Sequence, residues 1–400
     1  MVWLNIIGIG EDGWEGLTAK SHLIIQSAKH IVGSTRTLSM LPATRATHHE
    51  WPQPFSAVVD QLKSLQGQPT VILATGDPMN YGVARKLLEF IPKVEVNITP
   101  HLSAFSLAAS RMGWSLPDCD SFTIHGRPAS NLEAFVQPHA KLLVLTQDET
   151  SIAEVCRRLI ARGFNQSEVT VLENLNGSKE RITTFIAHKI PAMAWSPLNV
   201  LAIQCIASAT AKIWSRVAGL PDDAFVHDGK ITKREVRAAT LAALAPCPDQ
   251  LLWDVGAGSG SIGIEWMRST RGCEAVAIEP LADRRAMIAT NADQLGTPRL
   301  KIIGEAAPLA YAGLPRPHAV FIGGGISDSG TFEGAWATLR SSGKMVVNVV
   351  TIEGEMHLYD LQEKHGGELV RIDVSTLTHV GSLRAMKPRM AVLQWRVIKP

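Results

Sequence analysis

Residues 251–265 read LLWDVGAGSGSIGIE, an apolar run that ends in an acid and three alternating glycines. The glycines, Gly256, Gly258 and Gly260, would let the chain turn tightly and let a ligand lie against the backbone. Asp254, placed just before them, would repel a pyrophosphate but attract an ammonium group. The stretch therefore predicts a nucleotide site whose ligand carries a positive charge.

Two positions further along the chain fit the same ligand. Glu279 closes the next apolar run, where a carboxylate can accept both hydroxyls of a ribose, and Glu305 with Ala306 would flank an adenine edge after the third run. We expect S-adenosylmethionine, whose aminoacyl ammonium would face Asp254. Two alternatives stay open: a nicotinamide nucleotide, since residues 258–263 also fit GxGxxG, and a turn that binds nothing.

The first half of the chain carries glycine-rich turns with a different pattern. Its candidate cofactor contacts lie in three turns that follow apolar runs: Gly8, Gly10, Gly76, Asp77, Tyr81, Ser103 and Ala104. Each turn alone is equally compatible with a structural role, because GDP is a common turn and Ser103 is a good helix N-cap. The sequence thus predicts two unlike ligand cradles in one chain.

Short apolar runs alternate with amphipathic ones along the first half, which predicts an α/β fold with a largely parallel sheet. A chain of 400 residues is long enough for two domains. We place them at residues 1–206 and 226–400, with a linker at 207–225 that mixes small, polar and turn residues.

The second domain is expected to open with a helix and to continue with seven strands. Thr232 is the expected N-cap of that helix, with Glu235 at capping-box spacing, and is also a candidate cofactor contact. The strand candidates are 251–255, 274–279, 299–303, 318–322, 345–350, 368–374 and 390–397. Helix-length segments separate the first five, and a loop, THVGSLRAMKPR, joins the last two, which suits a doubly wound Rossmann-like sheet closed by an antiparallel pair.

The charge and the residue composition argue against nucleic-acid, metal and membrane binding. A formal net charge of +2 without a Lys/Arg run gives no basis for nucleic-acid binding. Five scattered cysteines without CxxC spacing argue against disulfides and a zinc cluster, and the histidines show no HExxH spacing, so no metal is expected. The first apolar run is too short to span a membrane and lacks signal-peptide features, so we expect a cytoplasmic protein that does not bind membranes.

The order of motifs in the first half resembles the tetrapyrrole methylase family. The motifs are IGIGEDGWEGLT, TGDPMNYGVARKLL, TPHLSAFSLAASRMG and TVLENL, within residues 1–205. The second half resembles small methyltransferases of the cobalamin pathway that also decarboxylate, through GLPDDAFVHDGKITKREVRA, DVGAGSGSIGIE and FIGGG. The resemblance implies a two-lobed first domain, one S-adenosylmethionine site per domain, a homo-oligomer, and methylation of a precorrin at C5 and C15 with loss of carbon dioxide from the C12 acetate.

Because such a macrocycle bears many carboxylates, the resemblance points to basic side chains as its anchors. The candidates are Arg127, Arg36, Lys233, Arg384 and Lys387. His227 and Asp228 are candidates for handling protons, and residues 323–325, all glycine, would give the macrocycle room. The alternatives are solvated surface charge for the basic residues, a plain loop for 227–228, and, for the whole chain, a nicotinamide-dependent oxidoreductase or a tetrapyrrole-binding protein without catalysis.

Overall fold

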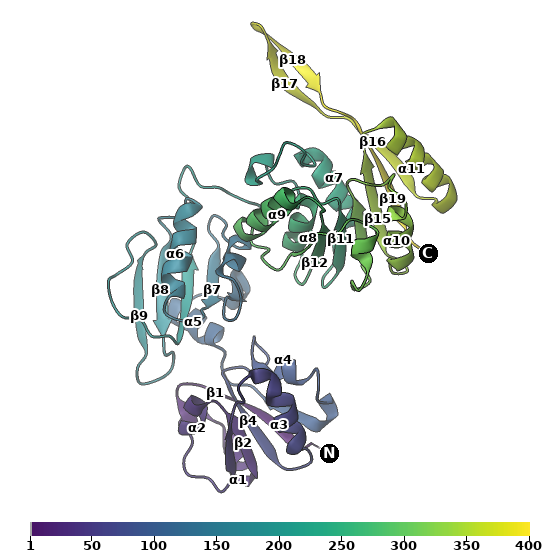
Figure 1. Cartoon of the computed structure of the whole chain (residues 1–400). Coiled ribbons are helices and arrows are strands. Elements are labelled where there is room, and N and C mark those ends of the chain that lie inside the picture. Colours follow the sequence, from purple (N-terminus) through teal and green to yellow (C-terminus); the bar gives the residue numbers. More distant parts are fainter. Residues whose placement is uncertain (1) are drawn as a thin grey trace. The chain divides into compact units, whose positions relative to one another are not determined.

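The computed structural model describes residues 2–400, which divide into two compact units (Figure 1). Unit 1 contains the chain up to Ala129 together with Pro138–Lys212, and unit 2 contains Ser130–Gln137 and Ile213–Pro400. The chain thus passes from one unit to the other within the expected linker, and a short segment of the first half packs with the second unit.

The first lobe of unit 1 is a parallel sheet of five strands in the order β3-β2-β4-β1-β5. Its strands are β1 (Leu4–Ile9), β2 (His30–Gly33), β3 (Thr47–Glu50), β4 (Thr70–Thr75) and β5 (Val96–Thr99). Its helices are α1 (Ala19–Ser27), α2 (Thr35–Ser39), α3 (Val58–Ser64) and α4 (Val83–Leu87). β1 and β4 are almost fully buried, because continuous apolar runs such as TVILAT suit central strands with both faces covered.

The second lobe of unit 1 is a mixed sheet in the order β6-β7-β10-β8-β9. Its strands are β6 (Cys119–Thr123), β7 (Lys141–Leu145), β8 (Glu168–Glu173), β9 (Arg181–Ile186) and β10 (Asn199–Gln204), and its helices are α5 (Ala104–Met112) and α6 (Ser151–Ala161). Here the expectation of a largely parallel sheet was wrong, since only β6 and β7 pair in parallel. β8, β9 and β10 follow one another without an intervening helix, and parallel neighbours need such a crossover.

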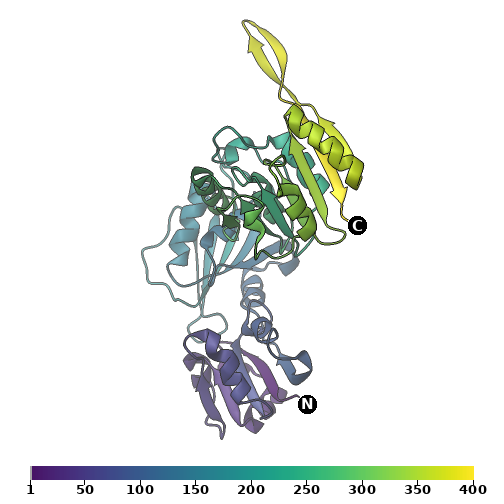
Figure 2. The same ribbon diagram turned by 45° about the vertical axis from the view of Figure 1, so that its right-hand side comes forward.

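Unit 2 is built on a sheet of seven strands in the order β13-β12-β11-β14-β15-β19-β16 (Figures 1 and 2). Its strands are β11 (Leu251–Val255), β12 (Glu274–Ile278), β13 (Lys301–Ile303), β14 (Ala319–Ile322), β15 (Lys344–Val349), β16 (Glu368–Ile372) and β19 (Val392–Ile398). Its helices are α7 (Arg234–Leu244), α8 (Ser261–Ser269), α9 (Ala282–Gln294), α10 (Thr331–Thr338) and α11 (Ile352–His365). All seven expected strands are present, and β19 pairs antiparallel with β15 and β16, which confirms the doubly wound sheet.

Two local expectations for unit 2 were wrong. The expected loop THVGSLRAMKPR lies mostly in a hairpin of β17 (Ser375–Val380) and β18 (Leu383–Pro388), because Gly381, at φ 62°, forms a two-residue turn with Ser382. Thr232 does not cap the first helix: α7 begins at Arg234 after Lys233, which makes no side-chain capping bond. The Thr232 carbonyl instead accepts a hydrogen bond from the buried Arg237 guanidinium.

The linker region contributes to the core of unit 2. Trp214, Leu220 and Phe225 are buried there, and Ser130–Gln137 packs with the same unit through a hydrogen bond from Gln137 Nε2 to the Trp214 carbonyl (2.6 Å). Only about the first third of the expected linker, residues 207–212, therefore belongs to unit 1.

Trace trypsin is expected to cut the folded chain first near Lys212, and the two fragments should stay together. The side chains of Lys212 and Ile213 are exposed, whereas Ser130–Gln137 would remain bound to the C-terminal fragment by its packing in unit 2. Gel filtration followed by mass spectrometry checks this. First cuts inside any of the three large sheets, or fragments that separate without denaturant, would contradict the proposed boundary.

Candidate active sites

The glycine turn of unit 2 has the backbone that only glycine adopts readily. Gly256, Gly258 and Gly260 have φ values of 70°, 59° and 75°, and α8 begins immediately after them. A Cβ on Gly256 or Gly260 would press on Gly324 or Ile288, whereas one on Gly258 would meet only the Lys230 carbonyl at 3.7 Å. Gly258 therefore borders open space at the carboxyl end of β11, where ligands bind in such sheets.

Asp254 lies beneath this turn rather than in the open space. Its side chain is 1% exposed, and Oδ2 accepts a hydrogen bond from the Gly263 amide (2.9 Å), while Oδ1 is buried without a hydrogen-bond partner. Burial raises the pKa of this carboxyl to about 7, and the charge of Glu279 adds to the shift. Asp254 thus holds the start of α8 against the end of β11, and its predicted contact with an ammonium stays a prediction.

Glu279 is held at the end of β12 by backbone amides. Its Oε2 accepts from the Gly258 amide (2.8 Å) and its Oε1 from the Leu281 amide (3.1 Å). A carboxylate has about four acceptor positions, so two remain for ribose hydroxyls. The structure therefore brings together Asp254, the glycine turn and Glu279, while Glu305 and Ala306 lie exposed after β13.

The residues just before α7 lie beside this turn. Asn291 in α9 is fully buried; it bonds the Val226 amide (2.7 Å) and carbonyl (2.9 Å) and also the Ser259 carbonyl (2.9 Å). Asp228 accepts two bonds from Arg284 (2.8 and 3.0 Å), and its pKa is lowered by the Lys230 amide and by Arg284. Residues 226–232, called the 226–232 segment from here on, are thus held against the glycine turn of unit 2.

In unit 1 the three candidate turns, two of them glycine-rich, converge at the carboxyl ends of β1, β4 and β5. A Cβ on Gly8 would lie 2.1 Å from the Gly76 carbonyl and 2.5 Å from the His101 amide, so only glycine allows this approach. Ser103 caps α5 through a bond to the Ser106 amide (3.1 Å), as expected. Ala104 begins that helix.

The remaining candidates of unit 1 lie close to these turns. Asp77 Oδ1 accepts from the Met79 amide (2.8 Å), and Tyr81, 42% exposed at φ 56°, packs under the Arg127 guanidinium at 5.5 Å. Gly10 contacts His101 closely as well. The predicted cofactor turns therefore form one cluster, with Arg127 at its side.

The basic side chains predicted to bind the substrate carboxylates fall into two sets: those close to a carboxylate of the protein and those exposed on β18. Arg36 is bonded to Glu11 and to Thr75 Oγ1, so its charge is already matched by a carboxylate. Lys233 lies 3.9 Å from Asp222. Arg384 and Lys387 are exposed on β18, in the hairpin that extends beyond the seven-stranded sheet (Figure 1).

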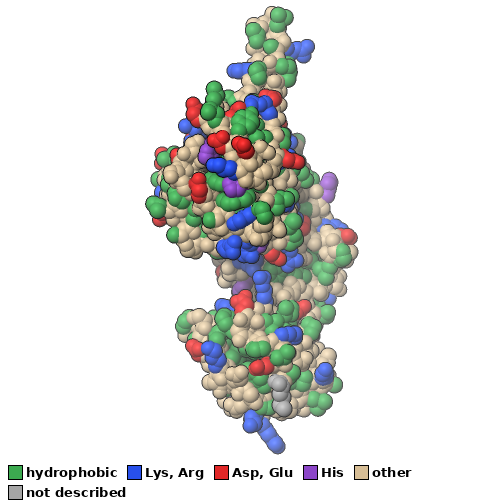
Figure 3. All heavy atoms as spheres, turned by 90° about the vertical axis from the view of Figure 1, so that its right-hand side faces the viewer, with side chains coloured by type: hydrophobic (Ala, Val, Ile, Leu, Met, Phe, Trp, Pro, Cys, Tyr) green, Lys and Arg blue, Asp and Glu red, His purple; other side chains and the backbone are tan. Residues whose placement is uncertain are grey.

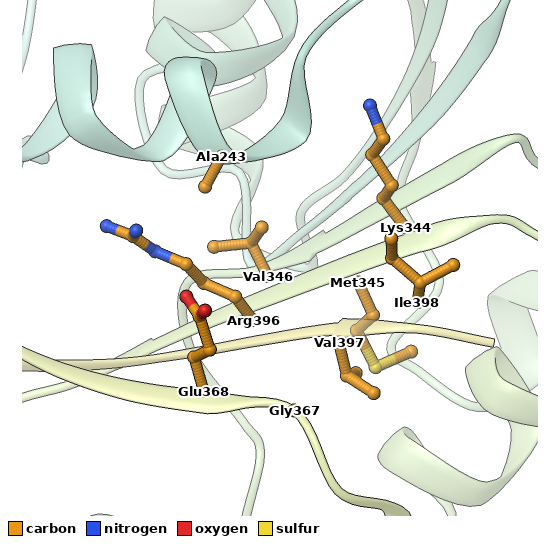
Figure 4. A pocket seen from close by; sticks show the side chains of 9 residues that line it. All are labelled: Ala243, Lys344, Met345, Val346, Gly367, Glu368, Arg396, Val397 and Ile398. Atoms are coloured by element: carbon orange, nitrogen blue, oxygen red, sulfur yellow. The ribbon is translucent and has the colours of Figure 1, made fainter.

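A pocket of about 500 Å3 in unit 2 lies away from the cofactor turn. Figure 4 shows its lining: Ala243, Lys344, Met345, Val346, Gly367, Glu368, Arg396, Val397 and Ile398. Lys344 begins β15, so the pocket is at the amino ends of the parallel strands, the edge opposite the glycine turn. Ligands of open α/β sheets bind at the carboxyl edge, so this pocket and the predicted cofactor site lie at opposite edges of the sheet.

Comparison with known proteins identifies the family. A model of tetrapyrrole (corrin/porphyrin) methylases matches residues 4–189, and a model of the precorrin methyltransferase domain matches 223–399. Over 394 residues the chain is 43% identical to a precorrin-6Y C(5,15)-methyltransferase [decarboxylating] of a Sinorhizobium species, covering 98% of this chain and 95% of the relative. The chain belongs to this family.

Two further comparisons agree in name. A Mycobacterium tuberculosis protein with the same name is 36% identical over 404 residues, covering 98% of this chain and 99% of its own. The crystal structure of the C-terminal domain of a precorrin-6Y C5,15-methyltransferase from Rhodobacter capsulatus is 44% identical, with a TM-score of 0.44, and covers 46% of this chain and all of that one (100%). Family members are named as methyltransferases, and the open space beside Gly258, with the free acceptor positions of Glu279, fits the adenosine part of S-adenosylmethionine.

Sequence reasoning missed the residues that hold the unit 2 site together. Asn291 lies on the buried face of α9 with Ile288, Ala292 and Leu295, at the spacing i, i+3, i+4 and i+7. A polar side chain on such a stripe must find buried hydrogen bonds, which is a signal that the sequence contained. Arg284 gave no comparable signal, because its partner Asp228 is 56 positions away.

Proposed function

We propose that the chain is a bifunctional S-adenosylmethionine-dependent C-methyltransferase of cobalamin biosynthesis. It would methylate precorrin-6Y (precorrin-6B) at C5 in unit 1 and at C15 in unit 2, and decarboxylate the C12 acetate to give precorrin-8. The observation that carries the proposal is the presence of two unlike glycine cradles, one in each unit, in a chain whose full-length relatives are named for both methylations. Unit 1 therefore holds one cofactor and unit 2 a second.

The bound cofactor supplies an electrophilic methyl group, and the protein's part is to align it with a nucleophilic carbon of the macrocycle. In unit 2 the Gly258 amide fixes Glu279, which would hold the ribose, and the turns of Gly256 and Gly324 lie against each other. In unit 1 the Gly8, Gly76 and His101 backbones form the floor of the site. Alignment by these rigid turns can lower the barrier without a strongly activated side chain.

Of the two residues predicted to handle protons in unit 2, Asp228 is already paired, and His227 is placed to donate a hydrogen bond. The lowered pKa of Asp228 and its bonds to Arg284 make it a poor base near neutral pH. His227 Nδ1 accepts a bond from the Gly229 amide (3.0 Å), so the neutral ring carries its proton on Nε2. That Nε2–H can donate to a substrate carboxylate, while Lys233 supplies a charge nearby in sequence. On loss of carbon dioxide, the electron pair enters the protonated macrocycle, which serves as its own electron sink.

A homo-oligomer formed through the β17–β18 hairpin is part of the proposal. Leu377, Val380, Leu383 and Met386 are 60–73% exposed on this two-stranded ribbon, and Figure 3 shows hydrophobic and basic side chains along it. A two-stranded ribbon alone is marginal in water, and exposed apolar side chains on it call for a cover. Both outer edges of the hairpin, called the arm from here on, are free to pair with another strand. We propose that the same arm of a second copy pairs there and buries these apolar side chains.

Leu383→Lys with Met386→Lys should convert the oligomer to a monomer of 43.3 kDa. Charges placed on the apolar side chains of the arm would have to be buried in the contact, which is unfavourable. Sedimentation velocity measures the mass, and Arg316→Gln, remote from the hairpin, is the control. A wild-type chain that sediments as a monomer, or a double variant that stays oligomeric, would count against the arm.

The test of the proposed function is direct. Purified protein is incubated with the reduced precorrin and methyl-labelled S-adenosylmethionine, and the product is weighed by mass spectrometry. We expect two labelled methyl groups and the loss of one carbon dioxide. A substrate that binds but gains no label would favour a tetrapyrrole-binding protein instead.

We propose the cytoplasm as the compartment of this protein. Its five cysteines form no disulfide, which suits a reducing environment. Within residues 2–400 no helix has the length and apolar character to cross a membrane.

A further inference from the structure

We propose that Arg284 is a positioning residue for cofactor binding in unit 2, acting by fastening the 226–232 segment over the glycine turn. The inference rests on the proposed function, since it concerns the cofactor site of that unit. It assigns a role to a side chain outside the glycine turn and the acids beside it.

Arg284 lies between two carboxylates that belong to different parts of the site. Its guanidinium bonds Asp228 through Nε and Nη2 (3.0 and 2.8 Å), and its Nη1 lies 3.9 Å from Glu279 Oε2. Asp228 belongs to the 226–232 segment, and the same Glu279 oxygen accepts the Gly258 amide. One cation therefore links the segment, the expected ribose acid and the glycine turn.

The segment forms the nearest wall of the open space beside Gly258. Among residues 2–400, apart from its two chain neighbours, the Lys230 carbonyl alone lies within 4 Å of a Cβ placed on that glycine. Asp228 fixes Lys230 by accepting its amide at 3.0 Å. A shift of Asp228 would thus move the wall that a bound cofactor touches.

The rest of the segment is anchored independently, so loss of Arg284 should loosen it locally without unfolding it. Asn291 bonds Val226 on both its amide and its carbonyl, and the buried Arg237 bonds the Thr232 carbonyl. Asp228 lies between these two anchors, and its side chain is 36% exposed. Arg284 therefore controls the part of the segment that faces the turn, whereas Asn291 and Arg237 hold its ends.

The test uses the full-length chain and calorimetric binding of S-adenosylhomocysteine. Arg284→Gln should weaken binding at one of the two sites by about tenfold, the scale of one charge-assisted hydrogen bond. Asp228→Asn should weaken the same site, and the double variant should be no weaker than the stronger single effect, because the two residues act as a pair. In turnover, the KM for S-adenosylmethionine in the methylation by unit 2 should rise while kcat changes less than about twofold.

The matched control is Arg371→Gln, which breaks an exposed pair with Glu355 (2.8 Å) elsewhere in unit 2. It should leave both affinities unchanged. Salt should weaken wild-type binding more than binding by Arg284→Gln, because ionic strength screens the pair. Affinities of Arg284→Gln within twofold of wild type, or additive effects in the double variant, would overturn the inference. Wild-type protein that binds no S-adenosylhomocysteine would instead refute the proposed function.

Discussion

Replacing Gly258 by valine is expected to leave one methyl transfer intact and to abolish the other, together with decarboxylation. Gly258 has a φ of 59°, which a β-branched residue adopts only under strain, and its missing Cβ borders the space assigned to the cofactor. The added methyl groups would fill that space, so we expect affinity at unit 2 to fall about a hundredfold or more, which is about 2.7 kcal/mol. The product should carry one new methyl group and an intact acetate, identified by mass and by carbon-13 NMR.

Gly313→Val is the matched control for this change. Gly313 has a φ of 73° with nothing within 4 Å of its Cβ position, and it precedes β14, at the edge opposite the cofactor turn. It carries the same kind of backbone strain without touching the site, so it should still yield the doubly methylated, decarboxylated product. The same product from a folded Gly258→Val protein would contradict the assignment of one methylation to unit 1 and of the other, with decarboxylation, to unit 2.

Asp254→Asn is expected to make unit 2 more stable near neutral pH and to remove a pH dependence that the wild type shows. Burial raises the pKa of Asp254 from 3.8 to about 7, so the folded state keeps a proton that the unfolded chain has already lost. The resulting stability is fully present below about pH 4 and is lost as the pH rises to about 7. Raising the pKa of Asp254 from 3.8 to about 7 corresponds to about 4 kcal/mol in the free energy of unfolding.

Differential scanning calorimetry between pH 4 and 8 measures this effect. The melting temperature of unit 2 in the wild type should fall relative to that of Asp254→Asn as the pH rises, by roughly 2–4 °C for each kcal/mol in a unit of this size. The difference should level off above about pH 7.5. If the melting temperatures of the two proteins changed in parallel with pH, Asp254 would ionise normally in the fold. That result would contradict the raised pKa that its burial beneath the turn explains.

The sequence carried enough information for the sheet of unit 2 because each strand is an apolar run bounded by turn residues. It also located the glycine turns, since backbone conformations such as those of Gly256 and Gly260 demand glycine. The hairpin of β17 and β18 was missed because its strands have no buried face, so the period-2 pattern of half-buried strands is weak there. The signal that remained was the Gly381-Ser382 turn.

What the sequence could not supply were contacts between distant segments. The mixed sheet of unit 1 depends on which strands pair, and β10 enters between β7 and β8 far from both in sequence. The depth of Asp254 beneath the turn and the bonds of Asn291 depend on packing around α8 and α9. The pairing of Asp228 is a further case, since Arg284 bonds it from 56 positions away in the sequence.

The central claim, that one chain carries two independent cofactor sites, is tested most directly by the stoichiometry of S-adenosylhomocysteine binding. Titration calorimetry of the full-length protein should give two molecules bound per chain, and the Gly258→Val protein should give one with its affinity unchanged. A wild-type chain that binds a single molecule, or a Gly258→Val chain that still binds two, would contradict the account.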